Sequence, residues 1–350
     1  MTKYSSRSNK SEIFMNKTRF ERLIALLISF LLIFSIAGCG AAEQNGGSDE
    51  LTKVRFLLDW LPNTNHTGIY AAASLGYFAE EGLDVEIIQP GEGSALSLVA
   101  AGKADFCVTF QEEIASALAS DSPLPVTAIA ALIQHNTSGI ISLAENNIVD
   151  PADMQGHSYA TWDTPIEKAI LGALIQEDGG DIAEVEMIPN TVTDVVTGLK
   201  TDIDMVWVYY AWDGIATELA GLETNFIDFG KENSALDFYT PVLAAADSYL
   251  KKNPETAKAF LRAAAKGYEY AIANPDKAAN ILVEAAPELD PELVKASQTW
   301  LKDQYKAEVA IWGYIEQERW DRFMNWMFEN ELIGNKLDSG AGFTNEYLKD

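Results

Sequence analysis

The chain has 350 residues and a formal net charge of −27, with 52 acidic side chains against 25 basic ones. So acidic a surface repels phosphate backbones, which argues against nucleic acid as a partner. Single hydrophobic cores stop growing near about 250–300 residues, so this length predicts two lobes rather than one.

The first 38 residues have the three parts of a secretory signal, which are basic residues, an apolar run and small residues. The apolar run covers 23–37 and is shorter than the roughly 20 residues that a transmembrane helix needs. It ends at Ile36-Ala37-Gly38-Cys39, which resembles the lipobox of bacterial lipoproteins, where the thiol accepts a diacylglycerol. We therefore predict a signal peptide over 1–38 and lipidation, with palmitate, at Cys39. An ordinary cleaved signal and a membrane anchor are the alternatives, and Met15 is an alternative start.

Residues 39–52 are polar and rich in glycine, so we expect a flexible tether before a folded part that starts near Lys53. Once Cys39 is lipidated, Cys107 is the only other cysteine and no intrachain disulfide can form. Stability must then come from the hydrophobic core. These features predict a protein at the cell membrane, anchored by lipid on the extracytoplasmic side.

Short apolar runs alternate with longer amphipathic ones through the first two-thirds of the folded part, which is typical of α/β sheets with crossover helices. The predicted strands are 54–58, 83–88, 106–109, 126–133, 140–143, 157–160, 185–188 and 205–208. The predicted helices are 67–81, 94–101, 165–177 and 194–200.

The sequence from Pro254 onward is helical, and prolines at 275, 287 and 291 divide it into short helices. Apolar residues recur there at helical spacing, which predicts that they face the core. These residues are Phe260, Leu261, Ala264, Tyr268, Ala271, Trp320, Phe323, Trp326 and Met327.

Motifs for catalysis are scarce. The chain has three histidines, and it contains no Gly-x-Ser-x-Gly elbow, Walker loop, Cys-x-x-Cys or His-Glu-x-x-His. The Gly-rich run at 90–94 reads better as a turn with Ser94 as helix N-cap than as an anion loop, because Glu92 would repel a phosphate.

Aromatic and polar residues cluster where four predicted strands end. In open α/β sheets, ligands bind beyond the carboxyl ends of the strands, so these clusters predict one shared cleft. Packing is the alternative for each aromatic residue taken alone. The clusters cover residues 59–66, 110–112, 161–167 and 207–213.

The chemistry of these clusters suits a flat, nitrogen-rich ligand. Trp and Tyr faces stack on planar rings, which contributes about 0.5–1.5 kcal/mol per pair beyond area burial. Carboxylates such as Asp59, Glu112 or Glu167 can accept paired N–H donors from an amino-heterocycle. A sugar also stacks on Trp, so a sugar ligand is an alternative at this point.

Several motifs resemble a known family over residues 53–350. They are the run from Asp59 to Gly68, Gly76-Tyr77-Phe78, Glu81-Gly82-Leu83-Asp84-Val85, Gly102-Lys103-Ala104-Asp105 and Gly267-Tyr268-Glu269-Tyr270. They resemble solute-binding lipoproteins of ABC importers related to thiamine-pyrimidine synthesis, whose members bind formylaminopyrimidine or riboflavin. The resemblance implies a type II periplasmic-binding fold, in which two open sheets are joined by a hinge of two crossovers.

The same resemblance implies the domains and the partners. Lobe one would comprise 53–137 and 241–350, and lobe two 138–240. A monomer would capture a thiamine-type pyrimidine precursor, formylaminopyrimidine or hydroxymethylpyrimidine, by lobe closure and deliver it to permease and ATPase subunits. Riboflavin is the alternative ligand, since the run Tyr209-Tyr210-Ala211-Trp212-Asp213 departs from the formylaminopyrimidine binders.

The family's fold also includes a eukaryotic enzyme that builds the thiamine pyrimidine from its own histidine and pyridoxal phosphate. His66 matches that histidine, but 234–241 lacks the enzyme's cysteine-rich motif, so we predict a binding protein without catalytic residues, metal or cofactor. Trp60, Asn63 and His66 match the family's first ligand loop. The full set of predicted ligand contacts is Asp59, Trp60, Asn63, His66, Gln111, Glu112, Trp162, Thr164, Glu167, Trp207, Tyr209, Tyr210 and Tyr239.

Overall fold

The computed structural model describes residues 50–91, 94–189 and 192–348. The predicted signal peptide at 1–38 and the lipidation site Cys39 lie outside the described residues. So do Glu92 and Gly93 of the Gly-rich run. Among the described helices, none is long and apolar enough to cross a membrane.

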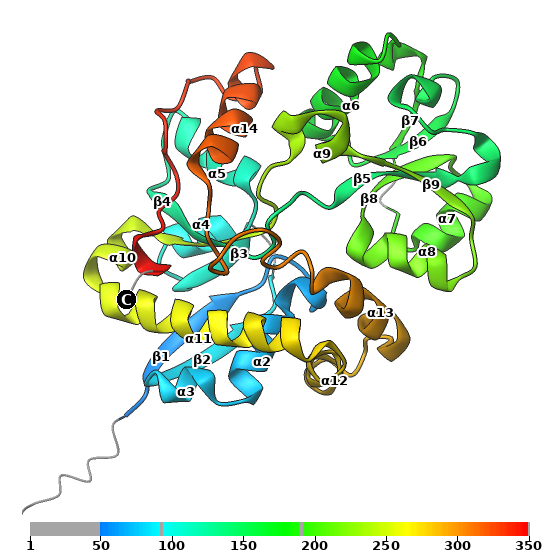
Figure 1. Ribbon diagram of the computed structural model, residues 1–350. Coiled ribbons are helices and arrows are strands. Elements are labelled where there is room, and N and C mark those ends of the chain that lie inside the picture. The colour runs from blue at the N-terminus through cyan, green and yellow to red at the C-terminus, as the bar shows by residue number, and fades with distance from the viewer. Residues whose placement is uncertain (1–49, 92–93, 190–191, 349–350) are drawn as a thin grey trace, which may run out of the picture. The chain divides into compact units, whose positions relative to one another are not determined.

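The first sheet has five strands in the order β2-β1-β3-β10-β4 (Figure 1). Strand β1 pairs in parallel with β2 and β3, whereas β10 is antiparallel to β3 and β4. Phe106–Thr109 is buried along its whole length, as expected for a central strand with both faces covered. The strands are β1 Thr52–Leu57, β2 Leu83–Ile88, β3 Phe106–Thr109, β4 Val126–Ala131 and β10 Val242–Ala246.

The second sheet repeats this arrangement in the order β7-β6-β8-β5-β9. Strand β6 is parallel to β7 and β8, and β5 is antiparallel to β8 and β9. In both sheets the antiparallel inner strand is the first strand after the chain arrives from the other sheet. The strands are β5 Ser138–Leu143, β6 Ser158–Thr161, β7 Glu186–Pro189, β8 Met205–Tyr209 and β9 Thr224–Asp228.

The chain therefore passes between the sheets twice. The first crossover, residues 132–137, joins β4 to β5, and the second, residues 237–241, joins the short helix η6 (Ser234–Leu236) to β10. The predicted α/β class with two open sheets and two crossovers is confirmed.

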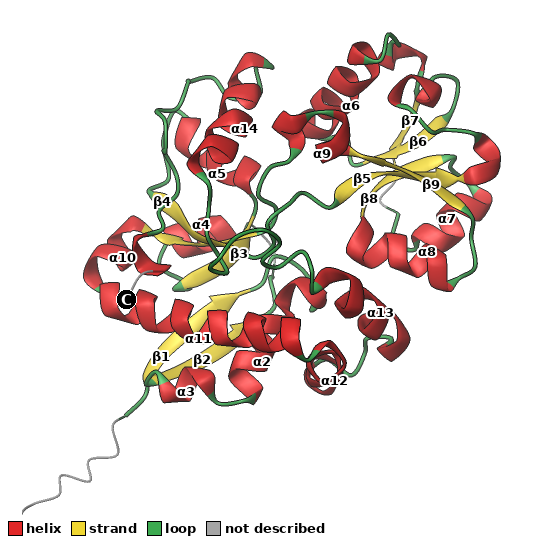
Figure 2. Ribbon diagram, in the orientation of Figure 1, coloured by secondary structure: helices red, strands yellow, loops and turns green. Residues whose placement is uncertain are grey.

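Helices flank both sheets (Figure 2). Those in the part of the chain that builds the first sheet are α2 Thr67–Ser74, α3 Tyr77–Glu80, α4 Ala95–Ala100, α5 Gln111–Ala119, α10 Asp247–Lys252, α11 Pro254–Ala273, α12 Pro275–Ala285, α13 Pro291–Leu301 and α14 Gln317–Glu329. Those of the second are α6 Pro165–Glu177, α7 Val195–Thr201, α8 Ile215–Leu219 and α9 Phe229–Glu232.

Some predicted boundaries were wrong. The single helix predicted over 67–81 is two helices, because Gly76 adopts a left-handed conformation with φ of 80° between α2 and α3. Gln111 and Glu112, which were predicted as loop residues, are the first residues of α5, and β4 ends at Ala131 rather than 133. Ser94 is the N-cap of α4, but its side chain makes no capping hydrogen bond.

The C-terminal helices supply much of the core. Every residue predicted to face it between Phe260 and Met327 is buried, which confirms the helical spacing argument. Phe106 stacks on Phe260 of α11 with ring centroids 4.3 Å apart, so the long helix lies directly on the first sheet. Phe238, just after η6, stacks on Phe323 of α14 at 3.9 Å.

Helices α2 and α11 approach each other closely because glycines meet at their contact. A Cβ atom at Gly267 would lie 2.0 Å from the carbonyl oxygen of Gly68, and one at Gly68 would lie 2.3 Å from the Tyr268 ring. These distances leave no room for a methyl group. The close contact fixes the loop before α2 against α11.

We expect Gly267→Ala to lower the free energy of unfolding by about 1–3 kcal/mol, since the helices must separate to admit the methyl group. Gly172→Ala is the matched control, because its Cβ would meet Ile182 at an ordinary 3.6 Å inside helix α6. That substitution should be neutral or stabilise the protein by about 0.5–1 kcal/mol. Urea denaturation measures both, and equal stability of the two variants would contradict the packing argument.

Candidate functional site

The loop after β1 is built around a buried histidine. The backbone N–H of Asn63 donates to Nδ1 of His66 at 3.2 Å, so Nδ1 is an acceptor and the ring proton lies on Nε2. Nε2 then donates to Oδ1 of Asp59 at 2.7 Å. The imidazole is fully buried and both nitrogens are used. His66 therefore holds the loop in shape. It does not face a cavity, although it was predicted to contact the ligand.

Tyrosines from α11 and from the turn after α13 anchor the same loop. The hydroxyl groups of Tyr305 and Tyr268 donate to the backbone carbonyls of Thr64 and Asn65 at 2.7 and 2.6 Å. Asn63 caps the short helix η1, Thr64–His66, with its side chain. This framework leaves Trp60 with 57% of its surface exposed, although large aromatic side chains are normally buried.

Trp60 lies at the edge of a cavity of about 160 Å³ formed by both sheets. Its walls come from the loop after β1, the residue after β3, the end of β8 and the second crossover. The lining residues are Asp59, Trp60, Asn63, Thr64, Asn65, Phe110, Tyr209, Ala211, Trp212, Asp213 and Pro241. We call this space the strand-end cavity.

Four predicted contacts line the strand-end cavity, namely Asp59, Trp60, Asn63 and Tyr209. Phe110, Trp212 and Asp213 also line it but were absent from the predicted set. Trp212 and Asp213 lie in the π-helical turn η5, Tyr210–Gly214, which brings them back toward the cavity. Burial and the charge of Asp194 raise the pKa of the Asp213 carboxyl to about 6.

The loop after β6 is organised by Glu167 at the start of α6. Its carboxylate accepts from the Tyr159 hydroxyl at 2.6 Å, the Thr161 hydroxyl at 2.7 Å and the Trp162 backbone N–H at 3.1 Å. Thr164 is the N-cap and completes a capping box with Glu167. Glu167 is buried and Thr164 is used in the cap, so both support the loop rather than line a cavity.

This support leaves Trp162 with 42% of its surface exposed. Its ring lies against Trp207, with centroids 5.7 Å apart, and Trp207 in turn meets Phe229 edge to face at 4.5 Å. The Trp207 Nε1 atom is buried and has no hydrogen-bond partner among the described residues. Trp162, backed by the buried Trp207, is thus the second exposed aromatic side chain at a strand end.

Gln111 and Tyr239 are hydrogen-bonded inside the protein rather than facing a ligand. The Gln111 side chain donates to the Trp320 carbonyl at 2.9 Å and accepts from the Tyr239 backbone N–H at 2.9 Å. The Tyr239 hydroxyl accepts from the Glu316 backbone N–H at 2.9 Å. Gln111 and Tyr239 are fully buried, so the structure gives them supporting roles instead of the predicted contacts.

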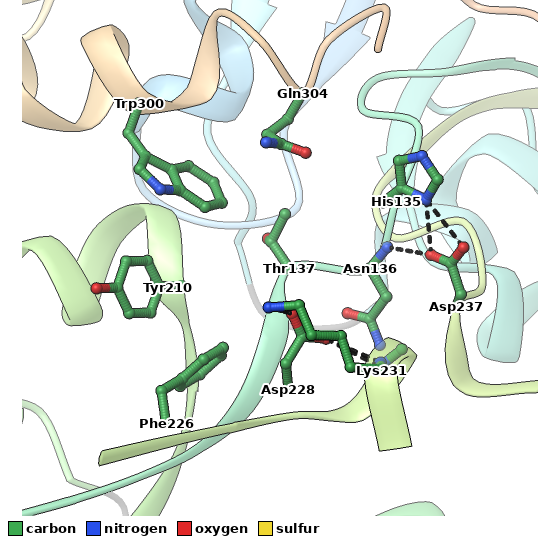
Figure 3. A pocket seen from close by; sticks show the side chains of 11 residues that line it. His135, Asn136, Thr137, Tyr210, Phe226, Asp228, Lys231, Asp237, Trp300 and Gln304 are labelled. Atoms are coloured by element: carbon green, nitrogen blue, oxygen red, sulfur yellow. Dashed lines mark hydrogen bonds and ion pairs between the residues drawn. The ribbon is translucent and has the colours of Figure 1, made fainter. Parts of the chain in front are cut away.

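Tyr210 faces a different space from its neighbour Tyr209. It lines a cavity of about 310 Å³ beside the crossovers, together with Phe226, Trp300, Gln304 and His135 among others (Figure 3). Its hydroxyl donates to Glu218. Glu112 lines a third cavity, near the start of α6. The predicted set is therefore divided among several spaces.

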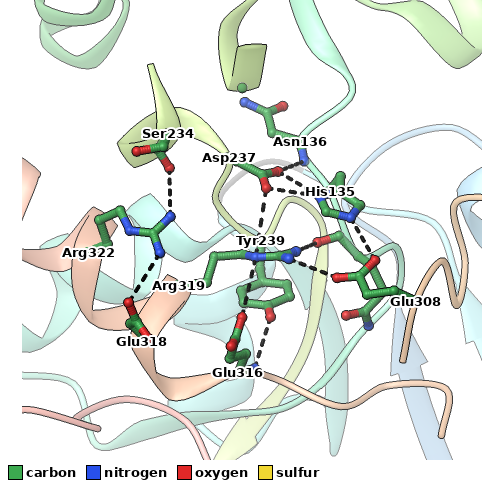
Figure 4. Close-up of polar contacts among 12 residues, drawn as sticks. His135, Asn136, Ser234, Asp237, Tyr239, Glu308, Glu316, Glu318, Arg319 and Arg322 are labelled. Carbon is green, nitrogen blue, oxygen red and sulfur yellow. Dashed lines mark hydrogen bonds and ion pairs between the residues drawn. The ribbon is translucent and has the colours of Figure 1, made fainter. Parts of the chain in front are cut away.

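A charged cluster connects the two crossovers (Figure 4). His135 lies in the first, and its Nδ1 and Nε2 approach the carboxylates of Asp237 and Glu308, each at 2.9 Å. Carboxylates only accept, so both ring nitrogens carry protons here. The hydrogen bond to Asp237, assisted by Glu308, raises the pKa of His135 against the effect of burial. Arg319 from α14 donates to Glu308 at 2.9 Å and lies over the Tyr239 ring.

Among the described residues, no group of three or more His, Cys, Asp or Glu side chains is arranged to hold a metal ion. Cys107 is buried in β3, and burial raises the pKa of its thiol well above the ordinary value. A thiol in that state is a poor nucleophile.

Residues 63–278 match the family described as NMT1/THI5 like. The chain is 29% identical to the formylaminopyrimidine-binding protein of Halalkalibacterium halodurans, over 92% of this chain and 98% of that protein. It is 26% identical to a 4-amino-5-hydroxymethyl-2-methylpyrimidine phosphate synthase of Saccharomyces cerevisiae, over 85% of this chain and 88% of that protein. Among solved structures, the periplasmic aliphatic sulphonate binding protein of Escherichia coli superposes with a TM-score of 0.67 at 15% identity, over 85% and 99% of the chains. The predicted family and the periplasmic-binding type of fold are thereby confirmed.

We expect Glu167→Gln to lower the free energy of unfolding by about 1–3 kcal/mol, because an amide nitrogen would face a hydroxyl or N–H donor in a buried site. The control is Glu177→Gln in the same helix, whose exposed carboxylate bonds only the half-buried Asn233 side chain among the described residues. It should change stability by less than about 0.5 kcal/mol. Thermal and urea unfolding measure both, and equal losses would show that Glu167 does not organise the loop.

The charged cluster predicts a pH dependence of stability. Because the pKa of His135 is raised on folding, its contribution is complete below the unfolded value of about 6.5 and is lost as pH rises through the folded value. His135→Gln should therefore be less stable than wild type at pH 5.5, with a smaller difference at pH 9. His157→Gln is the control, since His157 approaches one carboxylate at 3.5 Å. A difference for His135→Gln that is constant across pH would contradict the charge assignment.

Proposed function

The chain belongs to the NMT1/THI5-like family, and on that basis we propose that it is the solute-binding component of an ABC importer for a thiamine-type pyrimidine precursor. The candidate ligands are formylaminopyrimidine and hydroxymethylpyrimidine. The partners are a permease and an ATPase, and the protein acts as a monomer anchored through Cys39 on the extracytoplasmic side. The described relative of Halalkalibacterium halodurans, a formylaminopyrimidine-binding protein, supports this ligand class.

The observation that carries the proposal is the aromatic lining of the strand-end cavity. Trp60 and Phe110 come from the first sheet's strand ends, and Tyr209 and Trp212 from the second. A planar ring placed between them would contact both sheets and gain stacking energy from each side. Asp59, Asn63 and Asp213 supply hydrogen-bonding groups around its edge.

The volume of the strand-end cavity favours a ligand with a single ring over a ligand with three fused rings. Sites for drug-sized ligands usually measure about 300–1,000 Å³. The strand-end cavity measures about 160 Å³, which suits a substituted single heterocycle better than the fused rings of riboflavin. Riboflavin remains the alternative within the same class of function.

Transport would follow from lobe closure. The two crossovers are the only covalent links between the sheets among the described residues, so they form the hinge in this proposal. A ligand that contacts both lobes binds the closed form more tightly and shifts the population toward it. A ligand that touched one lobe alone would shift nothing.

A synthase related to the yeast enzyme is the alternative from another class. That activity would require a histidine at the cavity, whereas His66 is buried and both its nitrogens are hydrogen-bonded. Its ring is part of the loop that shapes the cavity, so consuming it would dismantle the site. These observations favour binding over synthesis, and incubation with pyridoxal phosphate and iron should give no pyrimidine product.

Isothermal titration calorimetry on the full chain in detergent tests the proposal. We expect one pyrimidine per chain, and a thermal stabilisation of about 2.7 kcal/mol at a hundredfold excess of ligand over Kd. Trp60→Ala should weaken binding about tenfold through lost stacking and burial. Tyr314→Ala is the control, since Tyr314 is similarly exposed but does not line the strand-end cavity.

Three outcomes would overturn the proposal. Binding of riboflavin but no pyrimidine would replace the ligand while keeping the class of function. Turnover dependent on His66 would replace the class. Equal binding by wild type and Trp60→Ala would remove the strand-end cavity as the site.

A further inference from the structure

A third cavity is lined by residues of α5 from the first sheet's part of the chain and by Pro165 and Ile166 at the start of α6. It measures about 430 Å³. Phe110 lines the strand-end cavity, and Glu112, two residues later on α5, lines this one. Burial first, and then the charge of Glu112, raise the pKa of the Tyr209 hydroxyl, which agrees with this closeness along the chain. The third cavity is thus linked to the wall of the candidate binding site through Phe110 and Glu112.

Glu112 has a polar atom without a partner. Its Oε2 atom is buried and makes no hydrogen bond to any described residue. Neighbouring carboxyl groups are satisfied: Glu113 accepts from the Thr109 hydroxyl at 2.6 Å, and Glu167 accepts from three donors. An unpaired buried polar group is destabilising, so the Glu112 Oε2 atom requires a ligand or another explanation.

The surroundings of Glu112 keep it neutral. The other described residues around the third cavity are serines, apolar side chains and Glu113, and no lysine or arginine is among them. Burial, with a smaller effect from the Glu113 charge, raises the pKa of Glu112 to about 8, against a hydrogen bond from its own backbone N–H. At pH 7 the side chain is then a carboxylic acid, with one O–H donor and one carbonyl acceptor.

A donor beside an acceptor matches a particular kind of ligand edge. We propose that the neutral Glu112 carboxyl recognises a ring nitrogen beside an exocyclic amino group, donating to the nitrogen and accepting from the amino group. The inference rests on the proposed function, because it assigns the edge by which the aminopyrimidine is selected. An ionised carboxylate would instead select two adjacent donors, as in a guanidinium group. Glu112 is in this sense a specificity-determining residue.

Substitution at Glu112 separates these two readings. Glutamine has the same shape and the same donor and acceptor as the neutral acid, and it does not titrate. We expect Glu112→Gln to bind 4-amino-5-hydroxymethyl-2-methylpyrimidine within about threefold of wild type at pH 7, whereas Glu112→Leu binds at least about tenfold more weakly. Glu177→Gln, at the exposed end of α6 and away from the three cavities, is the control and should bind as wild type does.

The pH profile is the second readout. Wild-type Kd, measured by calorimetry on the full chain in detergent, should rise toward about tenfold per pH unit once pH exceeds about 8. Kd of Glu112→Gln should stay flat over the same range. An analogue with hydrogen in place of the 4-amino group should bind wild type at least about tenfold more weakly, and bind Glu112→Leu as weakly as the amino compound does.

Failure of the inference differs from failure of the proposed function. If wild type binds the pyrimidine but Glu112→Gln loses as much affinity as Glu112→Leu, the carboxyl is ionised and the inference is wrong. If every variant binds alike, Glu112 does not contact the ligand. If wild type binds no pyrimidine, the proposed function fails and the ligand edge assigned to Glu112 fails with it.

The protonation state is tested without any ligand. Relative to Glu112→Gln, the unfolding equilibrium constant of wild type should rise by up to about tenfold per pH unit between about pH 5 and 8, because unfolding releases the proton held by Glu112. It should level off above that range. A ratio of the two constants that stays flat from pH 5 to 9 overturns the neutral acid, whether or not a pyrimidine binds.

Discussion

The arrangement of the two sheets depends on the hydrogen bonds and ion pairs that the Asp237 carboxylate makes between the two crossovers. Asp237 lies in the second crossover and accepts from the His135 ring and the Asn136 backbone N–H of the first, at 2.9 and 3.1 Å. Arg319 lies 3.7 Å from the same carboxylate and donates to the Gln134 carbonyl, so α14 is joined to both crossovers. In an otherwise strongly acidic chain, two cations at this point offset the repulsion between Asp237 and Glu308. The cluster thus keeps two separate chain segments together, and a cavity with walls from both sheets becomes possible.

Most of the fold follows from local pattern, and the differences have local causes. Eight of the ten described strands could be predicted because their apolar runs are short and bounded by polar turns, whereas β9 and β10 were missed. The break between α2 and α3 was missed because helical periodicity continues through Gly76, while the backbone there adopts a positive φ. Helix α5 was missed because its first turn, Gln111-Glu112-Glu113, is polar and resembles a loop. Acidic residues in a first helical turn are favoured by the helix dipole, so the signal was present but short.

Only part of the candidate site could be predicted from the positions of residues at strand ends. Trp60 and Tyr209 could be predicted because the end of a strand is encoded in the local sequence. Strand-end position could not separate Tyr209 from Tyr210, whose side chains line different cavities. Nor could it tell that Gln111 is used internally, since its partners Tyr239 and Trp320 are 128 and 209 residues away in sequence. Long-range hydrogen bonds decide whether a polar residue supports the site or lines it, and no single-sequence pattern contains them.

Whether the polar atoms of a residue are hydrogen-bonded therefore distinguishes a supporting residue from a ligand contact better than its position or its residue type does. His66, Glu167 and Gln111 are buried with their polar atoms paired, which is how a rigid support is built. Trp60 and Trp162 keep exposed faces at considerable solvation cost, and Glu112 Oε2 and Trp207 Nε1 are buried without partners among the described residues. A ligand with a planar face and an edge of mixed donors and acceptors would remove both kinds of cost together. In the proposed function this ligand is an uncharged amino-heterocycle, for which the aromatic walls supply stacking and Glu112 a mixed donor and acceptor edge.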